Sequence, residues 1–269
     1  MKTPGAALPL MRRALADSWR STLAWAVGLV AVMSLYLPLY PAIGGNAQMK
    51  QLLDSLPPEL IRALNYDQIA TGAGYTQATF FGLMGFLLMS IASVAWGAAA
   101  IGGDEEAGLL ELTLAHGVSR VQVVLERAAA LAVRVAVLSA VVLATIVVLS
   151  GPSQLGVGPG HAAGGVLLFA GLALLSGTAA LAAGAIGGRR FHGLAAGAAV
   201  AVAGYAFNAL GNQSSDLSWL HGLSPYHWAY GNAPLANGPD WGAVAAIYGL
   251  SAVFTAAAAA VLAQRDVGA

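Results

Sequence analysis

The residue types that most often perform chemistry are scarce in this chain. Of its 269 residues, 12 are Lys or Arg, 12 are Asp or Glu, five are His and none is Cys. The absence of cysteine excludes disulfides, thiolate metal sites and cysteine nucleophiles. The histidines do not share the i, i+4 spacing with which two side chains on one helix face bind a metal. They are His116, His161, His192, His221 and His227, and we expect no metal site among them.

Two other kinds of site can be weighed from short motifs. Glu105 and Glu106 form an adjacent carboxylate pair, which also occurs in glutamate-type intramembrane proteases, but the pattern E-E-x-x-x-R is broken here by Leu110. No G-x-x-x-x-G-K-[ST] phosphate loop occurs, and Lys2 and Lys50 are the only lysines. No convergent set of catalytic side chains is apparent. The chain is therefore not expected to be an enzyme or to hold ATP in that manner.

Composition places these few charged residues in a membrane protein. Hydrophobic residues make up 58% of the chain and charged residues 9%, with a mean hydropathy of +0.72. A soluble domain carries about 25% charged residues, whereas lipid requires no polar coat. Six segments have the roughly 20 apolar residues that a span needs. We predict an all-α integral membrane domain with spans at residues 21–43, 75–102, 127–150, 161–186, 193–210 and 241–262.

Basic residues predict the orientation of these spans. Positive charge favours the cytoplasmic side, and the basic residues fall on one side if the N-terminus is cytoplasmic, with only Lys50 and Arg62 on the other. An even number of spans then places both ends in the cytoplasm. We expect the protein to lie in the plasma membrane. Residues 1–20 mix apolar and charged side chains, which is typical of an interfacial amphipathic elbow helix before the first span. A neutral net charge gives no indication of nucleic acid binding.

The predicted external segments differ in character. Residues 44–74 form the longer one, in which we predict a short helix from Met49 to Leu64 that is interrupted at Pro57 and Pro58. Residues 211–240 carry many large apolar and aromatic side chains that would not remain in water. We expect this second segment to re-enter the outer leaflet or to lie along it.

The connection between the second and third spans, residues 103–120, holds the richest polar pattern. Asp104 can cap a helix whose first turn contains Glu105 and Glu106, where the helix dipole favours carboxylates. Gly117 is a natural end for that helix, and Ser119 can cap the next one. The sequence predicts a short amphipathic helix joined closely to two spans, which could transmit force from a docked partner.

These residues also carry a resemblance. The run from Glu105 to Arg120, E-E-x-G-x-L-E-L-x-L-A-x-x-V-S-R, resembles the first cytoplasmic loop of ABC-2-type transporter permeases. The stretch Leu-Ser-Pro-Tyr-His-Trp at 223–228, followed by Pro-Leu at 234–235, is similar to the family's external motif before its last span. The Gln-Arg-Asp-Val ending at 264–267 resembles the family's basic tail. One departure is Gly117, where many relatives have Pro.

The resemblance implies a fold of the ABC-2, type II exporter kind and a non-catalytic subunit. It implies two cytosolic ATP-binding cassette partners that hold ATP and Mg, a second permease chain, and a small amphipathic substrate such as a drug, antibiotic or lipid-like molecule. The connecting helix would couple to the ATPase through Asp104, Glu105, Glu106, Leu110, Glu111, His116, Ser119 and Arg120. The second and fifth spans would line the substrate path with Phe80, Phe81, Met84, Tyr205, Phe207 and Asn208.

Three alternatives stay open at this stage. The aromatic and Met residues of the second and fifth spans could instead pack internally or face lipid. Arg134, inside the third span, could extend its head to the lipid phosphates or form a gating ion pair with Asp17 or Glu126. An ion-coupled secondary transporter would need ionisable residues deep in the spans, and Arg134 is the one candidate there.

Overall fold

The computed structural model describes residues 8–43, 57, 69 and 71–265. The helix predicted from Met49 to Leu64 lies outside the described residues, apart from Pro57. Within the described residues all regular structure is helical, and six helices are long and apolar enough to span a membrane. The all-α fold with six spans is therefore confirmed. These helices are Pro9–Ala42, Gly72–Glu106, Arg120–Ser150, Pro159–Gly187, Arg190–Gly211 and Trp241–Gln264.

The first helix differs from the separate elbow that was expected. α1 runs without interruption as Pro9–Tyr36 and is followed by η1 (Leu37–Leu39) and α2 (Tyr40–Ile43). No proline occurs between Pro9 and Pro38, so nothing in the backbone chemistry ends the helix near Arg20. The charged residues of 9–20 are thus the first turns of the span helix itself.

The second span changes its helical geometry along its length. It consists of α5 (Gly72–Thr76), η3 (Gln77–Met84), α6 (Gly85–Ala98), η4 (Ala99–Gly103) and α7 (Asp104–Glu106). Both η3 and η4 are π-helical, a rare form that often marks functional positions. The short α8 (Leu109–Ala115) then leads to α9 (Arg120–Ser150).

α10 (Pro159–Gly187) is the centre of the bundle and packs against α6, α9, α11 (Arg190–Gly211) and α14 (Trp241–Gln264). Its small residues explain its central position. A Cβ on Gly97 of α6 would lie 2.1 Å from the carbonyl oxygen of Gly177. A Cβ on Gly193 of α11 would lie 2.7 Å from the carbonyl oxygen of Ala180. Glycine at these positions therefore allows the helix backbones to pack closely.

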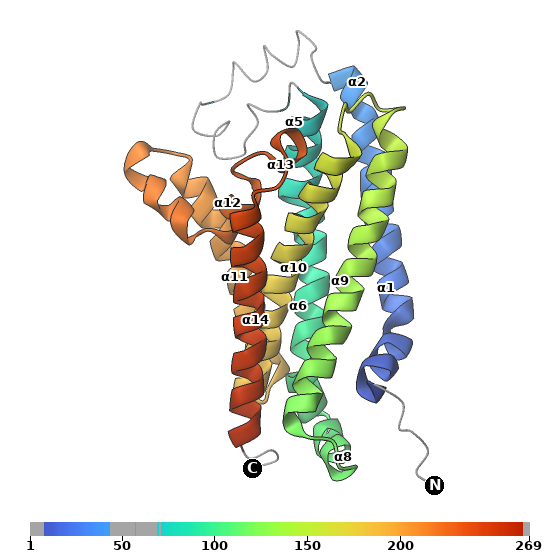
Figure 1. Ribbon diagram of the computed structural model, residues 1–269, viewed down its shortest axis with the longest axis vertical. Coiled ribbons are helices and arrows are strands. Elements are labelled where there is room, and N and C mark those ends of the chain that lie inside the picture. Colours follow the sequence, from blue (N-terminus) through green and yellow to red (C-terminus); the bar gives the residue numbers. More distant parts are fainter. Residues whose placement is uncertain (1–7, 44–56, 58–68, 70, 266–269) are drawn as a thin grey trace.

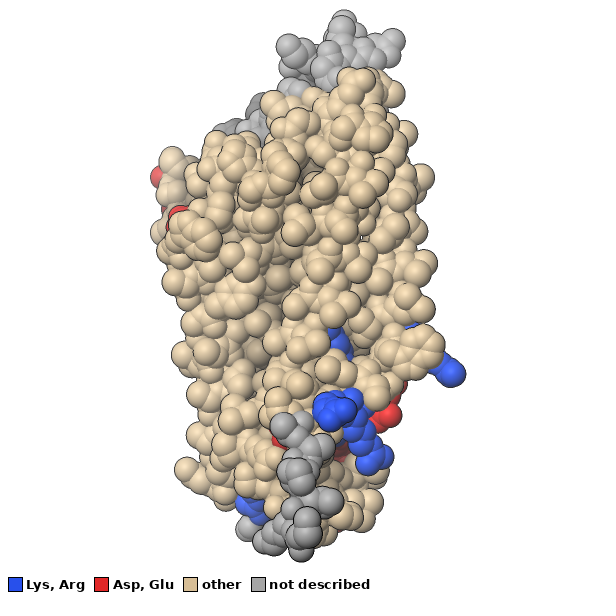
Figure 2. Space-filling model, turned by 45° about the vertical axis from the view of Figure 1, so that its right-hand side comes forward, with Lys and Arg blue, Asp and Glu red and all other residues tan. Residues whose placement is uncertain are grey.

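The polar features are concentrated at one end of the bundle. α8, the start of α1 and the end of α14 lie at the same end, and α2, α5 and α13 (Pro234–Asn237) lie at the other (Figure 1). On the face drawn in Figure 2, the Lys and Arg atoms gather toward the lower end of the bundle. η5 (Ser215–Leu223) and α12 (Pro225–Tyr230) connect α11 to α13 beside the opposite half of the bundle (Figure 1).

Candidate partner-docking site at the end of the bundle

α8 is bounded by two glycines in the left-handed conformation. Gly108 has φ 68° and Gly117 has φ 81°, a region that glycine enters without steric penalty. The chain therefore breaks at Ala107 and Gly108, not before Asp104. Asp104, Glu105 and Glu106 form the last turn of the second-span helix. This corrects the expectation that they begin the loop helix, and it places the carboxylates beside the bundle.

α8 is anchored on one side and open on the other. Leu110 is 1% exposed and packs in a cluster that includes Ile101, Val124 and Leu262. Complete burial of a leucine contributes about 1.5–3 kcal/mol relative to an exposed one. Leu109 and Leu112, by contrast, are 50% and 60% exposed, and Glu106, Glu111 and His116 are exposed beside them. This outer face is amphipathic, and its side chains are exposed in the described part of the chain.

Two of the predicted contact carboxylates are engaged inside the subunit. Asp104 accepts a hydrogen bond from Arg127 at the start of the third span, and Glu105 accepts one from Arg265 at the end of the sixth. All four side chains are largely shielded from solvent. The exposed fractions are 22% for Arg127 and 20% for Asp104, and 24% for Arg265 and 15% for Glu105. Removing one partner from such a pair leaves a poorly solvated charge. These residues tie the spans together and are not free for a partner.

Arg265 extends this network to the fourth span and adds a second contact with the third. Its Nη1 donates to the Ile186 carbonyl at the end of α10, at 3.3 Å. Its own carbonyl accepts a hydrogen bond of 2.7 Å from Arg120 at the start of α9. Gly188 permits this approach, since a Cβ there would lie 2.7 Å from Arg265 Nη1. Arg120, predicted as a partner contact, thus joins α9 to α14.

The last two predicted coupling residues act locally. Ser119 Oγ accepts a hydrogen bond of 3.2 Å from the Gln122 N–H and caps α9, as the capping-box spacing predicts. His116 Nδ1 lies 2.6 Å from the Leu112 carbonyl oxygen. Of the predicted coupling residues, Glu106, Glu111 and His116 thus lie on an exposed face. The others make contacts inside the subunit.

Sequence reasoning missed the role of Glu126. Its carboxylate is 2% exposed and accepts hydrogen bonds of 2.7 and 2.9 Å from the N–H groups of Leu10 and Met11, and one of 2.7 Å from Gln122. The first N–H groups of a helix have no partner within it, and α1 has no side-chain cap of its own. Glu126 supplies that cap from another span, which no local pattern could indicate.

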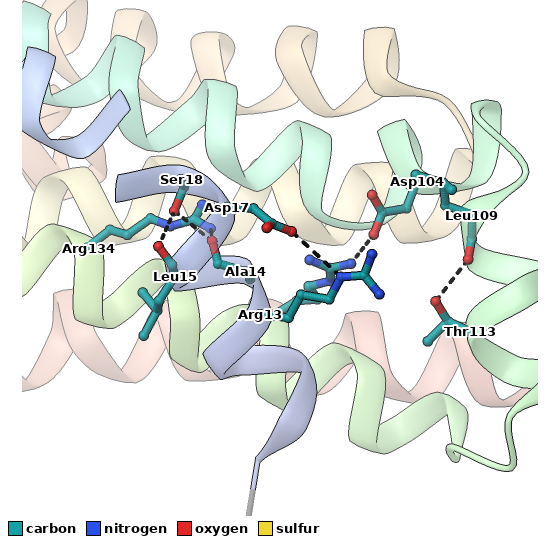
Figure 3. Close-up of polar contacts among 10 residues, drawn as sticks. Arg13, Ala14, Leu15, Asp17, Ser18, Asp104, Leu109, Thr113 and Arg134 are labelled. Carbon is teal, nitrogen blue, oxygen red and sulfur yellow. Dashed lines mark hydrogen bonds and ion pairs between the residues drawn. The ribbon is translucent and has the colours of Figure 1, made fainter. Parts of the chain in front are cut away.

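Arg134 does not form the predicted ion pair with Asp17 or Glu126. Its Nη2 donates to the Ala14 carbonyl at 2.7 Å (Figure 3). Its guanidinium lies 5.4 Å from the centre of the Trp96 ring. The proposed gating partners are engaged elsewhere, because Asp17 lies 3.7 Å from Arg13 and Glu126 caps α1. Its head is thus held between α1 and α6.

The comparison with protein families identifies the chain. Residues 8–267 match the family model described as ABC-2 family transporter protein. The chain belongs to this family. It is a multi-pass permease subunit of an ABC transporter, and the family implies partnership with ATP-binding cassette subunits. The comparison with curated proteins found no match.

At the opposite end of the permease, the predicted substrate-path residues do not share one environment. Phe80 and Phe81 are both 0% exposed and pack with Phe169 of α10, with ring centroids 5.2 to 5.9 Å apart. They form part of the subunit's own core. Met84 and Phe207 are partly exposed, so these two are available to a surface outside the subunit.

Tyr205 and Asn208 support the segment that follows α11. The Tyr205 ring packs edge-on against Tyr226, with centroids 5.3 Å apart. Tyr226 donates a hydrogen bond of 2.8 Å to the Gly82 carbonyl inside η3. Asn208 Oδ1 lies 3.0 Å from His227 Nδ1. α12 is thus attached to both the π-helical part of the second span and the end of the fifth.

His227 borders a hollow of about 470 Å³ whose lining includes Trp228, Asn232 and Asp240. Burial, and then the neighbouring His221, lower the pKa of the His227 ring. The two imidazoles stack with centroids 3.7 Å apart. Among the described residues, no group of three or more His, Asp or Glu side chains could hold a metal ion.

Proposed function

We propose that this permease is the membrane half of an exporter that moves an amphipathic compound, such as a drug, antibiotic or lipid-like molecule, out of the cell. The energy comes from ATP hydrolysed with Mg by separate cytosolic subunits. The observation that carries this proposal is the exposed face of α8 and of Glu106 just before it. Glu106, Leu109, Glu111 and Leu112 are exposed there, while Leu110 is embedded in the bundle. An amphipathic surface of this kind suits a cleft on another protein.

The surroundings of α8 support its use as a lever. Asp104 joins the base of α8 to the third span through Arg127, and Glu105 joins it to the sixth through Arg265. Arg265 also contacts the end of the fourth span at Ile186. A push on α8 when the ATPases close would therefore reach four spans at once. Packed elements of this type move between discrete arrangements and do not deform gradually.

We further propose that two permease chains form the transport path, either identical or similar. Phe80 and Phe81 belong to the core of one subunit, so Met84, Tyr205 and Phe207 are the residues that we assign to a path between subunits. The clustering of Arg at the end with α8 and the termini supports a plasma-membrane protein with that end in the cytoplasm.

Docking is tested by co-purification. We would reverse two exposed charges with Glu106→Lys and Glu111→Lys, co-express the variant with a candidate ATPase and purify the complex in mild detergent. Loss of the ATPase from the purified complex is expected. Asp216→Lys is the matched control, because Asp216 is exposed at the other end of the bundle, in η5. Equal recovery of the ATPase with both variants would refute the docking role.

Transmission is tested separately with Arg265→Gln. This change leaves the exposed face of α8 intact but removes the charged partner of Glu105. We expect the ATPase to bind and hydrolyse ATP while export falls. An ion-coupled secondary transporter would instead lose export when an uncoupler collapses the proton gradient and would keep it when ATP alone is depleted.

A further inference from the structure

A cavity of about 130 Å³ lies between α1, α6 and α9 near the end with α8. Small residues such as Ala14 and Ala99 form part of its wall, and its polar lining consists of Asp104, Arg127 and Arg134. Figure 3 shows this region, with Arg134 at one side and Asp104 at the other. The cavity is large enough for several waters or for one tetrahedral anion.

The lining has more positive than negative charge. Arg127 is paired with Asp104, but Arg134 has only the Ala14 carbonyl and the Trp96 ring as partners in the described part of the chain. Both arginines also keep a buried Nε–H without an acceptor. A charged group in a membrane span is unfavourable unless it is compensated. The cavity therefore combines one uncompensated cation with two unsatisfied donors.

The two arginines lie toward the end of the bundle that we assign to the cytoplasm. Arg127 and Arg134 are seven residues apart on one face of α9, which separates them by about 10 Å along the axis. The outward-facing side chains nearby on α9 are apolar, with Leu125 53%, Val133 38% and Val137 46% exposed. A ligand with its head in the cavity would lay an apolar tail along these side chains.

We propose that this cavity binds the phosphate group of an amphiphile, with an inner-leaflet phospholipid as its source. Phosphate oxygens accept several hydrogen bonds from guanidinium groups at once, so they would satisfy the free Nε–H donors and neutralise Arg134. A bound lipid would bridge α1 and α9 at the base of the lever, and the site does not depend on the proposed export.

The test uses the full permease, stripped of lipid in mild detergent, and measures lipid retention by native mass spectrometry. Phosphatidylglycerol is expected to bind, and diacylglycerol, which lacks phosphate, is not. Arg134→Gln should weaken phosphatidylglycerol binding about tenfold or more, because a charge-assisted hydrogen bond is lost. Arg20→Gln is the matched control: Arg20 also lies over a tryptophan, 5.5 Å from the Trp19 ring, but it is exposed and outside the cavity.

Two further measurements keep the proposal falsifiable if Arg134→Gln does not fold. Ala99→Leu retains both arginines but fills the cavity, and it should lose the same binding. On the wild-type permease, phosphatidylglycerol should raise the melting temperature and diacylglycerol should not. Displacement of the lipid by glycerol 3-phosphate would show that a free phosphate compound suffices, whereas failure to displace assigns the site to lipid. Equal retention of phosphatidylglycerol by wild type, Arg134→Gln and Ala99→Leu would overturn the proposal.

Discussion

The contact between Gly97 of α6 and Gly177 of α10 leaves no room for a methyl group. An alanine Cβ at position 97 would lie 2.1 Å from the Gly177 carbonyl oxygen, 2.9 Å from its carbonyl carbon and 3.2 Å from Ala180 Cβ. Favourable contacts between heavy atoms lie at about 3.5–4.0 Å. Two of these three neighbours are backbone atoms, so no side chain can rotate away. Gly97→Ala must therefore separate α6 from α10 by about 1 Å or more.

The expected cost follows from two opposing effects. Overpacking destabilises by about 1–3 kcal/mol, and replacing a helical glycine with alanine returns up to about 1 kcal/mol. A net loss of about 1–2 kcal/mol corresponds to a melting temperature lower by about 2–8 °C. Gly249→Ala is the matched control, since no atom lies within 4 Å of its Cβ position, and it should leave the melting temperature unchanged or slightly raised.

The assay is thermal unfolding in detergent, followed by the fluorescence of the six tryptophans. Both variants are compared with the wild type at one protein and detergent concentration. If Gly97→Ala melts at the same temperature as Gly249→Ala, the close packing of α6 on α10 does not limit stability and the reasoning is wrong.

Two further predictions concern the two ends of the bundle. Glu126→Ala should lower the free energy of unfolding by about 1–3 kcal/mol, because it leaves the Leu10 and Met11 N–H groups without an acceptor. Glu126→Gln retains an accepting oxygen and should lose less, so equal melting temperatures for the two variants would contradict the capping role. At the other end, the pKa of His227 is lowered by burial, so the unfolded chain takes up its proton first as the pH falls. Stability should decrease below about pH 6.5, and thermal melts should show a weaker decrease in His227→Gln than in His161→Gln, whose histidine is exposed.

The six spans were predictable because hydropathy alone encodes them, but the helix ends were not. The third span was expected at residues 127–150, whereas the helix begins at Arg120, where Ser119 caps it. The second was expected at 75–102 and continues to Glu106. Hydropathy reports the part of a helix that crosses hydrocarbon, while caps and left-handed glycines decide where the helix stops.

The location of the candidate site was predictable from the sequence, but its side-chain contacts were not. The motif between the second and third spans indicates a short amphipathic helix, and α8 is present. The pairing of Glu105 with Arg265 joins residues that are 160 positions apart, and no local pattern encodes such a contact. For the same reason, Phe80 and Phe81 resemble lining residues in the sequence, although their rings pack on Phe169.

The attachment of Arg265 to Glu105 has a consequence for biogenesis. A ribosome completes the second span long before the sixth, so the Glu105 carboxylate waits without its cation while most of the chain is made. The lever at α8 cannot become rigid until the last turn of α14 arrives and contacts Glu105, Ile186 and Arg120. A nascent subunit would thus hold α8 only loosely, and under the proposed docking role firm association with an ATPase would be reserved for finished chains.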